Sequence, residues 1–135
     1  MPDETIETQF PSTESSPASA RAFLRAALGT WRLDGFGEVT ELLTDELVAN
    51  VVRHVDAPMT VRAICRPERI RVEVEDPSTE PPRLMQPDTD TMRGRGIMLV
   101  EALATDWGAE VHDAGKTVWF EIDVTTATRE VHGDP

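Results

Sequence analysis

The sequence of 135 residues is poor in cysteine, in aromatic residues and in positive charge. Cys65 is the only cysteine, so an intrachain disulfide is excluded, and its place in an apolar alternating run predicts a buried, inert thiol. Thirteen Lys and Arg residues against 25 Asp and Glu residues give a net charge of -12. Nucleic acids and anionic lipids attract cationic surfaces, so this charge disfavours direct binding to either, whereas it suits a basic protein partner.

The sequence also lacks long apolar runs, targeting signals and lysine. No apolar stretch approaches the length of a membrane span, and no basic segment precedes an apolar one near the N-terminus. We therefore expect a cytoplasmic protein that makes no contact with a membrane. Lys116 is the single lysine among the thirteen basic residues, and we attribute the excess of arginine to genomic base composition rather than to chemistry.

Two helices are predicted in the first half of the chain. Ser16 and Pro17 are typical of an N-cap followed by proline at the first helical position. Apolar residues then recur at helical spacing from Phe23 to Trp31. A second helix is predicted from about Glu38 to Val55, with an apolar face formed by Val39, Leu42, Leu43, Val48, Val51 and Val52.

The second half of the chain alternates with a period of two, which predicts antiparallel strands with one wet face. The alternation covers residues 60–65, 70–75, 107–111 and 118–124, with turns at 67–68 and 113–115. Residues 77–95 contain four prolines and read as a long loop, and a helix is predicted from Ile97 to Ala104. Residues 5–10 are either a short edge strand or a frayed tail.

These elements predict an α+β fold. We expect a two-layer sandwich in which helices cover one face of a mixed, mostly antiparallel sheet. The expected organisation is an acidic N-terminal segment (1–15), one folded domain (16–124) and a polar C-terminal tail (125–135).

Two polar residues of the second helix are the first candidate site. Glu46 and Asn50 are four residues apart, so they share one helix face one turn apart. A carboxylate and an amide offer a general base and a neutral oxygen for a hard cation such as Mg²⁺. A solvated helix edge is the alternative interpretation of the same spacing.

Asp76 and a pair of glycines are the other candidates. Asp76 continues the parity of Ile70, Val72 and Val74, so its side chain should face the helices, where a carboxylate needs a donor such as an adenine amine. Capping of the turn at Pro77 is the alternative. Gly94-Arg95-Gly96 precedes a predicted helix, and free backbone N–H groups at a helix start can bind an anion such as phosphate.

Taken in order, these segments resemble the histidine-kinase-type (GHKL) ATPase superfamily, which includes gyrase, MutL and histidine kinases. Residues 46–54 resemble its asparagine-containing helix motif, Asp76-Pro77-Ser78 its Asp-x-Gly motif, Gly94-Arg95-Gly96-Ile97 its second glycine motif, and residues 115–120 its closing hairpin. The resemblance covers about residues 17–124. Within this superfamily, the small size of the chain resembles that of the stand-alone anti-sigma-factor serine/threonine kinases of actinobacterial type.

The resemblance implies roles for the matching residues. Glu46 would be the catalytic base, Asn50 would hold Mg²⁺, and Asp76 would accept a hydrogen bond from the adenine of ATP with the support of Thr117. Gly94, Arg95, Gly96 and Ile97 would contact the phosphates beneath a lid formed by residues 80–95. A homodimer is implied, with a sigma factor and an anti-sigma-factor antagonist as partners.

Two functions follow from the resemblance. The first is a protein kinase that phosphorylates the antagonist and sequesters the sigma factor. The second is a non-catalytic module that binds nucleotide or a partner without turnover. Ser78 in place of the expected glycine and the proline-rich loop favour the second function, whereas the Glu46 and Asn50 pair favours the first. An ATPase without an acceptor protein is a third, weaker hypothesis.

Overall fold

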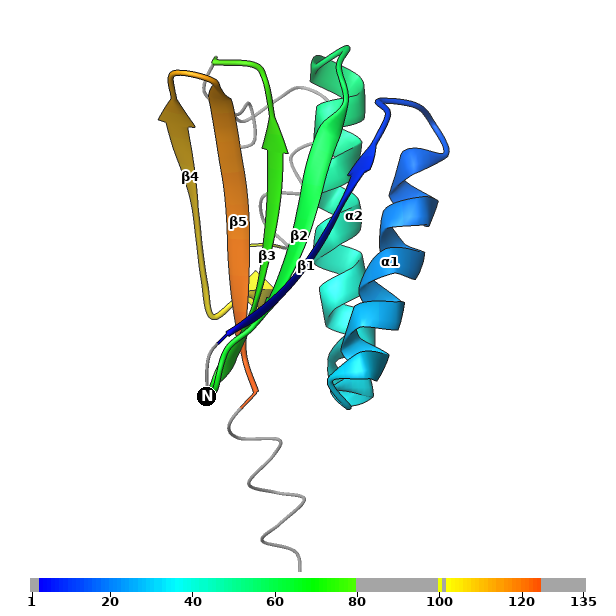
Figure 1. Cartoon of the computed structure of the whole chain (residues 1–135), viewed down its shortest axis with the longest axis vertical. Helices are drawn as coiled ribbons and strands as arrows, with labels where there is room; N and C mark the ends of the chain where they lie inside the picture. The colour runs from blue at the N-terminus through cyan, green and yellow to red at the C-terminus, as the bar shows by residue number, and fades with distance from the viewer. Residues whose placement is uncertain (1–2, 80–99, 101, 125–135) are drawn as a thin grey trace, which may run out of the picture.

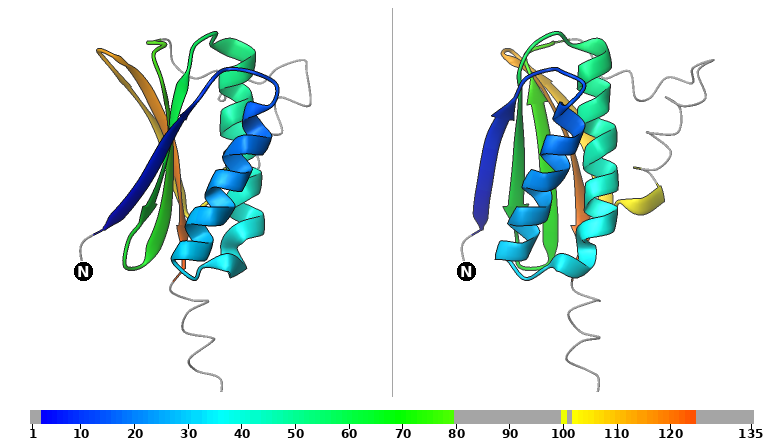
Figure 2. Two further views of the ribbon diagram at one scale, coloured as in Figure 1. Left: turned by 45° about the vertical axis from the view of Figure 1, so that its right-hand side comes forward. Right: turned by 90° about the vertical axis from the view of Figure 1, so that its right-hand side faces the viewer.

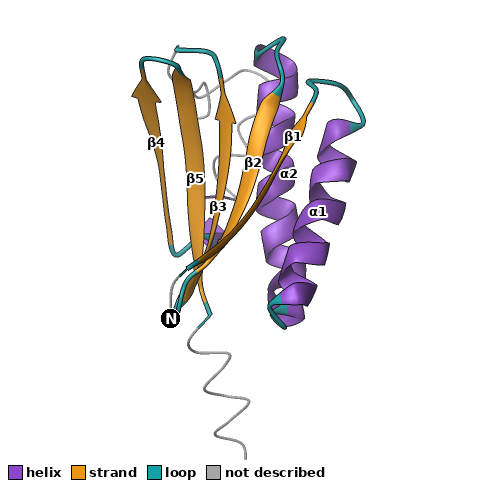
Figure 3. Cartoon of the chain, viewed as in Figure 1, coloured by secondary structure: helices purple, strands orange, loops and turns teal. Residues whose placement is uncertain are grey.

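The computed structural model describes residues 3–79, 100 and 102–124, and it places two helices against one face of a sheet (Figures 1 and 2). The strands are β1 (Glu4–Phe10), β2 (Met59–Cys65), β3 (Arg69–Asp76), β4 (Asp106–His112) and β5 (Gly115–Asp123). The helices are α1 (Ser16–Thr30) and α2 (Gly37–His54), joined through a short 3-10 helix, η1 (Asp34–Phe36). The predicted α+β two-layer architecture is confirmed (Figure 3).

The five described strands form one sheet in the order β1-β2-β3-β5-β4. Every described pairing is antiparallel, so the expectation of a mixed sheet is not met among these strands. β1 pairs with β2 along its whole length, from Glu4 opposite Cys65 to Phe10 opposite Met59. Of the two interpretations of residues 5–10, the structure therefore has the edge strand.

Alternation of side chains divides the sheet into a dry face and a wet face, as the period of two predicts. The dry face packs under the helices, and its buried core includes Val61, Ile70, Val72, Val74 and Phe120 from the strands. The helices contribute Leu24 and Leu28 from α1 and Leu43, Leu47 and Val48 from α2. Cys65 lies at the end of this row and is only partly buried, and burial raises the pKa of its thiol.

Two ion pairs fix α1 on one flank of α2. Arg25 donates two hydrogen bonds to Glu41, at 2.8 and 3.1 Å, and Arg21 pairs with Asp45. Within the sheet layer beneath them, α1 contacts β1 and β2, whereas α2 contacts β3 and β5. The opposite flank of α2 therefore lies over the β5 side of the sheet.

The start of α1 differs from its prediction. Ser16 lies inside the first turn rather than at the N-cap, which is Ser15, and no side-chain hydrogen bond caps the helix. The Ser16 hydroxyl is buried and donates to the Pro11 carbonyl, so this serine ties the β1–α1 connection to the helix. Pro17 occupies the first turn as predicted, where its missing N–H costs nothing.

The third predicted helix, residues 97–104, falls partly outside the described residues. Of its described residues, Val100, Ala102 and Leu103 are helical. The C-terminal tail is also outside the described part of the chain. Among the helices that the structure describes, none is long and apolar enough to cross a membrane.

Candidate functional site

Asp76 ends β3 with a buried side chain that faces the helix layer, as its parity predicts. Its neighbours on the same face are Val72 and Val74, and it is 3% exposed. Oδ1 accepts a hydrogen bond from the Ser78 backbone N–H at 2.8 Å and another from Lys116 Nζ at 3.1 Å. Oδ2 lies 3.1 Å from the same Nζ atom but accepts no hydrogen bond from any residue that the structure describes. One oxygen of this buried carboxylate is therefore still able to accept a donor.

Lys116 is the side chain that sequence reasoning missed. It lies directly opposite Asp76 in the β3–β5 register and is 4% exposed. The sequence-based interpretation assigned no chemical role to this residue, whereas the structure gives it a buried carboxylate as its partner. Its parity with Val118 and Phe120 was a usable signal, because a charged residue at an inward position needs a partner.

Gly115 allows β5 to begin against the end of β3. Its φ is +149°, and a Cβ atom there would lie 2.0 Å from the Asp76 carbonyl oxygen and 2.8 Å from Pro77 Cα. A side chain at position 115 would therefore push apart the two strand ends that carry Asp76 and Lys116.

Glu46 and Asn50 lie on the flank of α2 that α1 leaves open. Nine residues separate Glu41 from Asn50, which is about two and a half helical turns, so Asn50 lies on the side opposite the Arg25–Glu41 pair. Both candidate residues are half-buried. Burial raises the pKa of the Glu46 carboxyl, the negative charge of Asp45 raises it further, and Arg53 partly offsets the two.

The structure brings the C-terminal half of α2 and the end of β3 to the same end of the molecule. Both helix and strand run toward this end, where β3 stops at Asp76 and β5 starts (Figures 1 and 2). The glycine motif, residues 94–97, and the proposed lid, residues 80–95, fall outside the described residues.

Thr117 does not contact Asp76 among the described interactions. It occupies the alternate parity of β5, opposite Glu75, and its hydroxyl lies 3.3 Å from His112 Nε2. The predicted support of Asp76 by Thr117 is therefore replaced in the structure by Lys116 and by the Ser78 backbone. The strand period explains the difference, since adjacent residues point to opposite faces.

A cavity of about 240 Å³ adjoins Asp76 on its outer side. It is lined by Gln9, Pro58, Thr60, Glu75, Asp76, Pro77 and Ala114, and neither Glu46 nor Asn50 borders it. It shares only Asp76 with the candidate site, and its other strand residues belong to the wet face.

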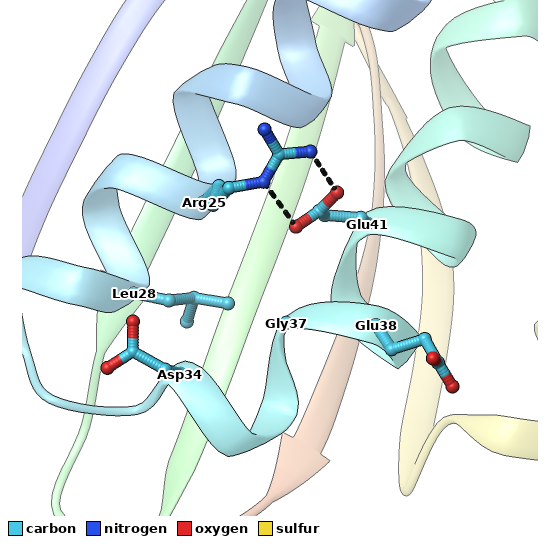
Figure 4. Close-up of a pocket in the computed structure, with 6 residues that line it drawn as sticks. All are labelled: Arg25, Leu28, Asp34, Gly37, Glu38 and Glu41. Carbon is cyan, nitrogen blue, oxygen red and sulfur yellow. Dashed lines mark hydrogen bonds and ion pairs between the residues drawn. The ribbon is translucent and has the colours of Figure 1, made fainter.

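A second cavity, of about 380 Å³, lies between α1 and the start of α2 (Figure 4). Its acids do not converge on a common point. Glu41 faces Arg25 and Glu38 points away from the cavity. Arg25 therefore pairs with only one of the three acids that line this cavity, and the arrangement indicates no particular ligand.

The described residues hold no cluster of three or more metal-ligating side chains. A magnesium ion that binds with a nucleotide takes most of its ligands from phosphates and water, so one protein oxygen is sufficient. The half-buried amide of Asn50 fits that requirement, since its carbonyl is a neutral, hard oxygen.

Comparison with known proteins identifies the family and supports the fold. Residues 10–122 match the family of the histidine kinase-like ATPase domain. No curated protein matches the chain. Two solved structures share the fold: the RsbU and RsbW domains of Rv1364c from Mycobacterium tuberculosis, with a TM-score of 0.65 and 19% identity, and the histidine kinase domain of the blue-light activated EL346 from Erythrobacter litoralis, with a TM-score of 0.55 and 17% identity.

The two structural matches cover most of this chain but a smaller share of each matched chain. They cover 88% and 87% of this chain, but this chain spans only 32% of the first structure and 65% of the second. The family match extends from the last residue of β1 to Ile122, the penultimate residue of β5, and includes α2 and Asp76. The chain belongs to the histidine kinase-like ATPase family.

Proposed function

We propose that the protein is an ATP-binding serine/threonine kinase of anti-sigma-factor type, which phosphorylates an antagonist protein and sequesters a sigma factor. The observation that carries the proposal is the buried carboxylate of Asp76, whose Oδ2 atom accepts no hydrogen bond from the described residues, at the same end of the molecule as the C-terminal half of α2, which carries Glu46 and Asn50. The family match and the fold shared with a structure that contains an RsbW domain support this proposal.

Each residue would act through its own chemistry. Asp76 Oδ2 would accept a hydrogen bond from the exocyclic amine of adenine, and a buried acceptor discriminates against bases that lack this amine. Gly94, Arg95, Gly96 and Ile97 would contact the phosphates. Asn50 would hold Mg²⁺, which when bound neutralises phosphate charge. We further propose a cytoplasmic homodimer, as the resemblance implies.

Glu46 would take the proton of the acceptor serine or threonine. The hydroxyl oxygen of the acceptor forms a bond to the γ-phosphorus, the bond from that phosphorus to the bridging oxygen breaks, and ADP leaves. The hydroxyl proton passes to the Glu46 carboxylate. A raised pKa suits this role, because a base whose pKa lies nearer the working pH accepts a proton more readily.

A non-catalytic regulatory module is the second candidate. Ser78 stands where the family has glycine, and its N–H is already bonded to Asp76 Oδ1. Pro77 removes one further backbone donor beside the carboxylate. Transfer of the γ-phosphate of ATP to a serine or threonine of a bound partner distinguishes the kinase from the module, which would bind the partner without a phosphorylated product.

Titration of ATP in the presence of Mg²⁺ tests the nucleotide site that both candidates share. We expect Asp76→Asn and Asn50→Ala each to weaken binding by about tenfold or more, since each removes one hydrogen bond or metal contact involving a charged group. Asp113→Asn is the matched control, because it removes an exposed carboxylate from the β4–β5 turn. Equal affinity in all four proteins would show that the site is assigned to the wrong residues.

A further inference from the structure

Asp76 and Lys116 both lie in segments that carry the family resemblance, but the resemblance gave Lys116 no role of its own. Lys116 Nζ lies 3.1 Å from both carboxylate oxygens, and the two side chains are 5% and 1% exposed. The two residues are 40 positions apart in the chain and are brought together by the β3–β5 register. A buried carboxylate without a countercharge is costly, so we expect Lys116 to hold the Asp76 carboxylate in place before any nucleotide binds.

We propose that Lys116 is a positioning residue for purine recognition: its ammonium group holds the Asp76 carboxylate so that the Oδ2 atom faces the adenine amine. This inference rests on the proposed nucleotide site. Lys116 would not touch the nucleotide. Its effect on binding passes through the carboxylate.

The hydrogen bonds at the carboxylate support this assignment. Oδ1 accepts hydrogen bonds from the Ser78 N–H and from Lys116 Nζ. Oδ2 is close enough to Nζ to share its charge, yet it accepts no hydrogen bond within the described part of the chain. The carboxylate is thus held through one oxygen and available through the other.

The geometry of the strand ends makes the contact rigid. The bare backbone of Gly115 allows the first residues of β5 to lie against the Asp76 carbonyl. Lys116 follows immediately and is buried, so its flexible stem has little freedom to leave the carboxylate.

Competition between Lys116 and adenine for the carboxylate is the opposite role, and it predicts the opposite change in ATP affinity. If Lys116 competed with adenine for the carboxylate, its removal would strengthen ATP binding. Under the positioning role, removal weakens ATP binding, because the Asp76 carboxylate loses the cation that holds it and can reorient. The two roles are therefore separated by the direction of one measured change.

The test compares ATP with purine riboside triphosphate, which has the same phosphates but lacks the exocyclic amine. We expect the wild-type protein to prefer ATP by about tenfold or more, the usual effect of one hydrogen bond to a charged group. Lys116→Met should reduce this preference to about threefold or less by weakening ATP binding alone. A purely structural role would weaken both ligands equally and leave their ratio unchanged, which would overturn the proposal, as would tighter ATP binding.

Arg66→Met is the control, since it removes a cation that is 41% exposed on the wet face, and it should keep the wild-type ratio. If Lys116→Met does not fold, Lys116→Gln keeps a hydrogen-bond donor without the charge and should also lose the preference for ATP. A Lys116→Gln protein with the wild-type ratio would contradict the role of the charge. A wild-type protein that binds neither nucleotide would refute the proposed nucleotide site itself.

The wild-type chain offers a measurement that needs no variant. Because Lys116 is the only lysine, a chain labelled with [¹⁵N]lysine gives one backbone amide signal, from the strand position opposite Asp76. ATP should shift this signal more than purine riboside triphosphate does. Equal shifts from the two ligands would count against communication between the adenine amine and Lys116.

Discussion

At the scale of single residues, environment separates the two acids of the site. Asp76 is almost fully buried, and its carboxylate has a countercharge in Lys116 and a hydrogen bond from the Ser78 backbone N–H. Glu46 is half-buried, has Asp45 beside it, and its carboxyl carries a raised pKa. A charged acceptor suits recognition of a base, whereas a carboxylate with a raised pKa suits proton transfer.

Glu46→Gln tests the second of these roles. We expect the substitution to lower the rate of phosphoryl transfer by about a hundredfold or more, while ATP binding stays near the wild-type value. A base must be deprotonated, so transfer by the wild-type protein should fall as the pH drops through the raised pKa of Glu46. The measurement is the initial rate of transfer as a function of pH.

Asp45→Asn provides the matched comparison. Because the charge of Asp45 raises the pKa of Glu46, its removal should move the acid limb of the profile to lower pH. Transfer by Glu46→Gln at the wild-type rate would exclude Glu46 as the base and would favour another proton acceptor.

At the scale of the element, the two flanks of α2 make different contacts. One flank carries Glu41 and Asp45, which pair with α1, and the other carries Glu46 and Asn50. The buried face between the flanks is not wholly apolar. Thr40 and Thr44, one turn apart, are fully buried, and neither hydroxyl has a hydrogen-bond partner among the described residues.

Thr44→Val should therefore stabilise the protein. Valine has nearly the same shape and removes a buried hydroxyl that lacks a partner, so we expect the free energy of unfolding to rise by about 1 kcal/mol. Chemical denaturation measures this change. Thr30→Val is the control, since the exposed Thr30 hydroxyl donates to the Ala26 carbonyl at 3.1 Å, and it should give no gain. Loss of stability in Thr44→Val would indicate that the hydroxyl has a partner in solution.

At the scale of the whole molecule, the net charge is -12, but arginine and glutamate side chains pair with one another on the wet face of the sheet. Glu121 pairs there with Arg66, Arg69 and Arg71 at 3.4, 2.8 and 2.9 Å. Arg71 also lies 4.0 Å from the centre of the Trp119 ring. Arg62 joins β1, β2 and β3 through Glu7, Glu73 and Glu75. The ion pairs thus cross strand boundaries on the face that has no helices.

Glu121→Gln should lower stability in a pH-dependent manner. Burial pushes the pKa of Glu121 upward, but hydrogen bonds from Arg69 and Arg71 outweigh it, and the pKa of the folded protein is lowered. The stabilisation is therefore present above the unfolded pKa and is lost as the pH falls through the folded pKa. Because Arg66 and Arg69 are about two-fifths exposed, solvent screening limits the expected loss near neutral pH to about 1 kcal/mol.

Denaturation of the wild-type protein and the variant at pH 7 and at about pH 3 measures this difference. The gap between them should narrow at the acidic pH. Glu110→Gln, at an exposed position on β4, should match the wild-type protein at both. A gap that does not change with pH would show that Glu121 acts through packing rather than through its charge.

Patterns within short stretches of the chain were sufficient to predict most helices and strands and the faces on which their residues lie. The two periodicities predicted α1, α2 and strands β2 to β5 to within a few residues, and the parity of β3 placed Asp76 on the inner face, because both depend on residues close together in the chain. The spacing of four placed Glu46 and Asn50 on one face of α2 for the same reason.

Only the tertiary structure decided which elements meet. Placing β5 between β3 and β4 set Lys116 opposite Asp76 and turned Thr117 toward His112, and no local pattern states the order of strands in a sheet. Two ion pairs likewise fixed the flank of α2 that α1 covers. Such contacts join residues far apart in the chain, and their energy depends on burial that exists only after the layers have packed.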